Sequence, residues 1–171
     1  MEPLVIRRAT PADAATLTEF ARRTFVETFA DTNTPDDMKA YCEEWYYEAR
    51  QRQEIEETAT LLAELDGVIV GYAQIREATD PAVDGPAPVE LVRFYVDRAC
   101  HGRGIAQQLM TATYAAARAL GGRTLWLGVW EHNARAIAFY VKCGFRDVGT
   151  HPFILGNDVQ TDRVMLRPLN D

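Results

Sequence analysis

Two glycines lie between apolar runs, in the segment 96-VDRACHGRGIAQQLM-110. A strand, a glycine-rich turn and a helix start in this order form an anion site. Successive backbone N–H groups point outward there, and the helix N-terminus adds partial positive charge. Gly102 and Gly104 would let a phosphate approach the backbone closely. A tight strand–helix turn without any ligand is the alternative interpretation.

The spacing in this segment does not fit two common phosphate sites. A Walker loop ends in Gly-Lys-Ser/Thr, which is absent here. A dinucleotide fold requires G-x-G-x-x-G, with an acidic residue about 20 positions later. No Asp or Glu occurs from Arg98 to Trp130. The segment therefore favours a pyrophosphate-bearing ligand other than NAD.

A second segment of interest is 131-EHNARAIAFYVKCGF-145, which follows an apolar run. Asn133 lies at the expected helix start, where its side chain can either cap the helix or bind a ligand amide. Tyr140 follows two turns later on nearly the same face. A tyrosine on an apolar helical face is usually a core residue with a satisfied hydroxyl, and this remains the alternative.

Hydrophobic periodicity and turn residues predict the elements around these segments. Pro11 indicates a helix start after the N-cap Thr10, and Asp66-Gly67 indicates a hairpin turn. The expected strands are 4–8, 60–65, 68–75, 89–96, 124–130, 145–155 and 159–169, and the expected helices are one from Pro11, 36–57, one ending near Leu120, and 133–142. This order predicts a mixed α/β sheet in one domain, residues 1–171.

The composition is that of an ordinary globular chain of 171 residues, with 47% hydrophobic residues and a net charge of −7. No run of eighteen apolar residues exists, and the N-terminus lacks a basic-then-apolar signal pattern. The three cysteines have no C-x-x-C spacing, which argues against a metal site or a disulfide framework. We expect a cytoplasmic protein with no metal, no membrane partner and no nucleic-acid partner.

The two segments together resemble the GNAT superfamily of acetyl-CoA-dependent N-acetyltransferases. Its first motif, Gln/Arg-x-x-Gly-x-Gly/Ala, is matched by residues 101–106, with His101 as the one departure. Its second, Asn-x-x-Ala-x-x-Phe-Tyr-x-x-x-Gly-Phe, is matched in full from Asn133 to Phe145. The resemblance implies a mostly antiparallel mixed sheet flanked by helices. It also implies that strand 89–96 splays from strand 124–130 to hold pantetheine.

The resemblance also implies roles for individual residues. Tyr140 is the expected general acid for the departing CoA thiolate, and acetyl-CoA is the only cofactor. Glu90 is the candidate base, because it lies six residues before Val96 and should share its face of the strand. An ion pair between Glu90 and a nearby Arg is the alternative. The cofactor-binding positions are Phe94, Tyr95, Val96, His101, Gly102, Arg103, Gly104, Ile105, Ala106, Asn133, Ala136, Phe139 and Lys142.

The expected acceptor is a small cationic amine. Segment 36–66 has ten acidic residues against three basic ones, and it contains Trp45-Tyr46-Tyr47, so it could attract a cation. A solvated acidic helix is the alternative. Stretches 24–38, 125–140 and 157–165 resemble the bacterial spermidine/spermine branch of the superfamily, which implies a polyamine. The candidate substrate-binding residues are Glu27, Trp45, Trp130 and His151.

Three questions stay open at this stage. The acceptor could instead be a peptide or protein amine, and the chain could be an acyl-CoA sensor without turnover. A GNAT branch that acetylates ribosomal-protein N-termini has a Glu where this chain has Gly128, which argues against that substrate. The oligomeric state is expected to be a monomer or a homodimer.

Overall fold

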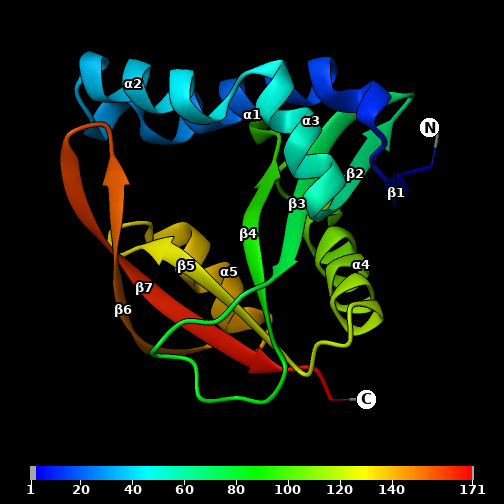
Figure 1. The fold of residues 1–171 in the computed structure, drawn as a ribbon. Helices are drawn as coiled ribbons and strands as arrows, with labels where there is room; N and C mark the ends of the chain where they lie inside the picture. The colour runs from blue at the N-terminus through cyan, green and yellow to red at the C-terminus, as the bar shows by residue number, and fades with distance from the viewer. Residues whose placement is uncertain (1–2, 171) are drawn as a thin grey trace.

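Seven strands form one sheet in the computed structural model, which describes residues 3–170 (Figure 1). Their order is β1-β2-β3-β4-β5-β7-β6. All neighbouring strands are antiparallel except β4 and β5. The strands are β1 (Val5–Arg8), β2 (Ala59–Leu65), β3 (Val68–Glu77), β4 (Pro88–Val96), β5 (Thr124–Trp130), β6 (Arg146–Leu155) and β7 (Asp158–Pro168). The predicted mixed, mostly antiparallel sheet is confirmed.

The parallel pair β4 and β5 separates soon after it begins. Residues 88–90 of β4 pair with residues 124–126 of β5, and no pair follows. The remainder of each strand, up to Val96 and Trp130, runs apart in the middle of the sheet (Figure 1). The expected splayed pair is therefore present, and it leaves strand edges without a ladder partner.

The two faces of the sheet have separate apolar cores. Alternate side chains of β2–β5 pack against α4 and α5 on one face, around the fully buried Leu109 and Leu125. The other face packs against α1–α3, around Leu17, Phe25 and Tyr72. The helices are α1 (Ala14–Phe29), α2 (Pro35–Trp45), α3 (Glu48–Glu57), α4 (Ile105–Ala119) and α5 (Ala134–Lys142). No helix among residues 3–170 is long and apolar enough to cross a membrane.

Local sequence accounts for most element boundaries. Thr10 and Asp13 form a capping box ahead of α1. Asp66 and Gly67 have φ of 53° and 75°, the left-handed values that a two-residue hairpin turn requires. One expectation needs correction, because segment 36–57 is not one continuous helical region. It breaks into α2 and α3, where buried Tyr46 packs into the core as the chain turns.

A β-bulge in β4 corrects the expected position of Glu90. Gln74 of β3 faces Arg93, but the next residue, Ile75, faces Leu91, so Val92 is an extra residue. A bulge reverses the alternation of side chains beyond it. As a result, Val96 packs with the α4–α5 core, whereas Glu90 lies on the opposite face. The prediction that Glu90 and Val96 share a face is wrong.

The bulge also places a charged residue inside the protein. Arg93 is 8% exposed, and its guanidinium donates to Glu54 of α3 and, at 2.8 Å, to Gln74. It lies over the ring of Tyr46, 5.2 Å from the centroid. Glu54 also accepts from Arg50 at 3.2 Å. Because a buried charge is costly without a partner, this group ties α3 to the centre of the sheet.

We expect Arg93→Met to lower the free energy of unfolding by about 3 kcal/mol, because it leaves the Glu54 carboxylate buried beside Arg50 alone. Replacing both partners removes the unpaired charge. The Glu54→Met/Arg93→Met variant should therefore be more stable than Arg93→Met. Urea denaturation of the wild type, both single variants and the double variant measures this coupling. Strictly additive losses would show that the ion pair does not hold α3 to β4.

Candidate active site

The loop between β4 and α4 has the backbone of an anion site. Gly102 and Gly104 have φ of 79° and 78°. Because this left-handed region is open chiefly to glycine, both positions require it. Within residues 3–170 no side chain caps the N-terminus of α4, so its first N–H groups have no side-chain acceptor there. The loop borders a cavity of about 610 Å³, called here the loop cavity.

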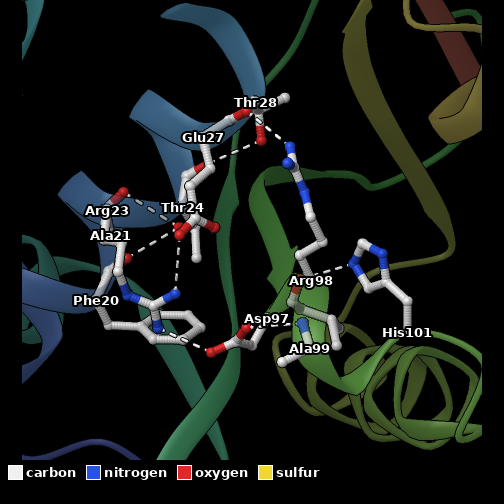
Figure 2. A network of polar contacts seen from close by, with 11 residues as sticks. Phe20, Ala21, Arg23, Thr24, Glu27, Thr28, Asp97, Arg98, Ala99 and His101 are labelled. Carbon is white, nitrogen blue, oxygen red and sulfur yellow. Dashed lines mark hydrogen bonds and ion pairs between the residues drawn. The ribbon is translucent and has the colours of Figure 1, made fainter.

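Polar contacts tie this loop to α1 (Figure 2). The Arg23 guanidinium binds the carboxylate of Asp97 at 2.8 Å. Arg98 reaches back to donate to the carbonyl oxygen of Glu27, also at 2.8 Å. The ring Nε2 of His101 donates to the carbonyl oxygen of Val96 at 2.9 Å. His101, the one departure from the first motif, thus ties the loop to the end of β4.

Helix α5 brings the second motif to the same cavity. The Asn133 side-chain oxygen accepts from the N–H of Ala136 at 3.2 Å, so the capping interpretation is confirmed. The Asn133 amide NH₂ remains available to another acceptor. Tyr140 is 8% exposed, and burial raises its pKa well above the usual value. Its ring packs between Phe94 and Phe145, and its hydroxyl has no hydrogen-bond partner among residues 3–170.

A second cavity, of about 660 Å³, lies between helices α1–α3 and strands β3–β7 and is called here the helix-side cavity. Aromatic rings line much of it, including Tyr41, Trp45 and Phe153. The two cavities meet at the opening between β4 and β5. The residues that border both are Thr28, Phe94, Tyr95, Asn133, Ala136 and Tyr140.

Most of the predicted cofactor positions border the loop cavity. They are Phe94, Tyr95, Val96, His101, Gly102, Gly104, Ile105, Ala106, Asn133, Ala136 and Phe139. Arg103 and Lys142 do not border it; the Arg103 guanidinium instead lies 3.8 Å from the Cys100 sulfur. Arg98 and Arg135 border the loop cavity as well. Arg98 lies four residues before Gly102, and Arg135 lies two residues after Asn133, so a positive charge beside each motif is the signal that could have identified them from the sequence.

The candidate acceptor residues separate into two groups. Trp45, Trp130 and His151 border the helix-side cavity, whereas Glu27 borders the loop cavity. Glu90 borders the helix-side cavity, but Arg76 binds its carboxylate at 2.8 Å. The alternative of an ion pair with a nearby Arg is therefore present in the structure.

The acidic segment 36–66 does not act as one patch. Three of its ten carboxylates form ion pairs away from the cavity: Glu43 pairs with Lys39, Glu48 with Arg52, and Glu64 with Arg7. Only three of its ten acidic residues border the helix-side cavity, namely Glu54, Glu56 and Glu57. The alternative of a solvated acidic segment therefore applies to the other seven, most of which are exposed.

A histidine between two carboxylates forms one wall of the helix-side cavity. His151 Nδ1 lies 2.9 Å from Asp80, and Nε2 lies 3.4 Å from Asp162. The hydrogen bond to Asp162 is the main cause that raises the pKa of His151 from 6.5 to about 9. Asp80 adds to this effect and burial opposes it. The imidazole is therefore protonated at neutral pH.

Comparison with known proteins agrees with this geometry. A model of the acetyltransferase (GNAT) family matches residues 18–145. An uncharacterized N-acetyltransferase of Mycobacterium bovis is 35% identical over 159 residues, which cover 92% of this chain and 98% of the relative. Family model and relative both span most of the chain.

Solved structures share the fold over nearly the whole chain. PaiA N-acetyltransferase from Thermoplasma acidophilum, in complex with coenzyme A, has a TM-score of 0.81 at 21% identity. The match covers 98% of this chain and 99% of that one. The yncA structure from Salmonella typhimurium, solved with its cofactor acetyl-CoA, has a TM-score of 0.69 at 27% identity. That match covers 99% of this chain and 96% of the other.

The raised pKa of His151 predicts a pH-dependent stability. Its stabilising effect should be complete below pH 6.5 and should disappear as the pH rises through about 9. Between these two pH values the free energy of unfolding of the wild type should fall by about 2–3 kcal/mol relative to that of His151→Gln. Chemical denaturation at several pH values measures this difference. The control is His132→Gln, since the His132 side chain is 68% exposed. Parallel pH profiles for the wild type and His151→Gln would contradict the prediction.

Proposed function

The chain belongs to the acetyltransferase (GNAT) family, and we propose that it transfers acetyl from acetyl-CoA to a primary amine of a small cationic acceptor, a polyamine. The acetyl group moves directly, within a complex of both substrates. The observation that carries the proposal is the junction of the two cavities at Tyr95, Asn133 and Tyr140. A donor in one cavity and an acceptor in the other would meet there.

Acetyl-CoA fits the loop cavity. The N–H groups of residues 102–106 would hold the pyrophosphate at the uncapped start of α4. The pantetheine arm would enter the opening between β4 and β5, where its amides supply the partner that the unpaired strand edges lack. The free amide NH₂ of Asn133 can donate to a pantetheine carbonyl. Arg103 and Lys142, outside the cavity, could meet only the outer phosphates.

The chemistry requires an unprotonated amine, and an alkylamine of pKa near 10.4 is unprotonated in only about one molecule in a few thousand at pH 7. The amine nitrogen attacks the thioester carbonyl carbon, and backbone N–H groups near Val96 stabilise the oxyanion. Before the attack, the proton of the bound ammonium passes through water to Glu90; after it, the excess proton on the attacking nitrogen passes to water and replaces the one that Tyr140 gives up. The C–S bond then breaks, and Tyr140 donates its hydroxyl proton to the departing sulfur.

The lining of the helix-side cavity supports a cationic acceptor. Six carboxylates border it against five cations, namely four arginines and the protonated His151. Several aromatic rings also face it, and such rings attract ammonium groups. The carboxylates are Glu54, Glu56, Glu57, Glu77, Glu90 and Asp162, and the arginines are Arg8, Arg50, Arg76 and Arg93.

Thiol release from acetyl-CoA with a panel of amines tests the function. We expect release with spermidine and spermine, and a KM for spermidine that rises as salt increases from about 0.05 to 0.5 M, because salt screens the carboxylates. Release with a peptide N-terminus but not with either polyamine would refute the acceptor. Tight CoA binding without release for any amine would indicate a sensor.

The proposed role of Tyr140 predicts a specific kinetic defect. Tyr140→Phe should lower kcat by about 100-fold through loss of the general acid, with little change in acetyl-CoA affinity. The fold should be unaffected, because the ring packing is retained and the hydroxyl has no partner in the described part of the chain. Tyr114→Phe is the matched control, since the Tyr114 hydroxyl donates to the Cys143 carbonyl oxygen at 3.2 Å and borders neither cavity. Equal kcat in wild type and Tyr140→Phe would reduce Tyr140 to a packing role.

A further inference from the structure

The group formed by Asp80, His151 and Asp162 has more negative than positive charge. A protonated imidazole has two N–H donors, and here each lies beside a carboxylate. His151 therefore has no donor left for a ligand, and a protonated ring cannot act as a base. Its effect is to hold Asp162 in place. Two carboxylates around one imidazolium leave one negative charge on the wall of the helix-side cavity.

Asp162 is the member of this group that presents an oxygen to the cavity. It is 7% exposed, and it borders the cavity whereas Asp80 does not. Only its Oδ2 atom approaches His151, and Oδ1 has no hydrogen-bond partner among residues 3–170. In the β5–β7 ladder Asp162 is directly opposite Trp130, which also borders the cavity. A carboxylate oxygen that is accessible from the cavity and lies beside an aromatic residue suits an alkylammonium group.

Gly128 provides the space for this arrangement. A Cβ added there would lie 2.6 Å from Nε2 of His151 and 3.0 Å from Oδ2 of Asp162. Any side chain at position 128 would therefore push the pair away. The glycine needs no special backbone conformation, so its role is to leave room.

We infer that Asp162, oriented by His151 and Asp80, binds a second ammonium group of the acceptor, one that does not react. A carboxylate favours the protonated form of an amine that it binds, and a protonated amine cannot attack the thioester. The reacting nitrogen must therefore be a different one. The enzyme selects diamines and polyamines over monoamines at this site. The inference rests on the proposed function and adds the residue that recognises the second charge.

Two acceptors of equal length test it: 1,5-diaminopentane, and n-hexylamine, which has a methyl group in place of one amine. The wild type should have the higher kcat/KM with the diamine. Asp162→Asn should lower kcat/KM for the diamine about 10- to 100-fold, as for loss of a charged hydrogen bond, and leave hexylamine within about twofold. The KM for acetyl-CoA should not change. His151→Asn, which leaves Asp162 unoriented, should reduce the diamine preference less.

Asp147→Asn is the matched control, because Asp147 lies on the same hairpin, pairs with Arg163 and borders neither cavity. It should keep the wild-type preference. If Asp162→Asn does not fold, Gly128→Ala serves as the second variant and should also reduce the diamine preference.

An equal loss of kcat/KM with both amines, or an unchanged preference for the diamine, would overturn the inference. If the wild type has the same kcat/KM with both amines, the inference about Asp162 is wrong, but the proposed acetylation of amines is still supported. No turnover with either amine or with spermidine would refute the proposed function itself.

Discussion

The separation of β4 from β5 is the constraint on which the rest of the structure depends. Two parallel strands in the centre of a sheet pair for only three residues and then part, which leaves unpaired backbone inside the protein. The surrounding elements hold that gap open from both sides. The β4–α4 loop is fixed to α1 by Arg23 and Arg98, and Asn133 starts α5 at the far side. A ligand with an extended chain of amide groups could form the hydrogen bonds that the unpaired edges of β4 and β5 lack.

The bulge at Val92 determines which side chains of β4 point to each face of the sheet beside the gap. Phe94 lies beyond the bulge and packs toward α5, next to Tyr140, while Arg93 points toward α3. One extra residue therefore divides the end of β4 between Phe94 and Val96, which border the loop cavity, and Arg93, which lies with the buried charges. The same strand thereby contributes to both cavities, which is why a donor and an acceptor can meet across it.

Local patterns predicted what depends on neighbours in the chain. Asn133 as a helix cap and the Asp66-Gly67 turn follow from short-range chemistry, and the structure has both. The sequence did not predict the bulge. Leu91, Val92 and Phe94 are all apolar, so the alternation of apolar and polar residues does not fix how β4 pairs with β3. Contacts between residues far apart in the sequence could not be predicted either. His151 meets a carboxylate 71 residues away, and Arg93 meets Glu54 39 residues away, and no local pattern encodes either pair.

A crystal structure of the protein with CoA tests the central claim most directly, because the claim concerns what occupies the space between two strands. The pantetheine arm should lie between β4 and β5 and bond to backbone near Val96. The pyrophosphate should lie on the N–H groups of residues 102–106. CoA bound elsewhere, with the gap filled by protein side chains, would contradict this assignment of the two cavities.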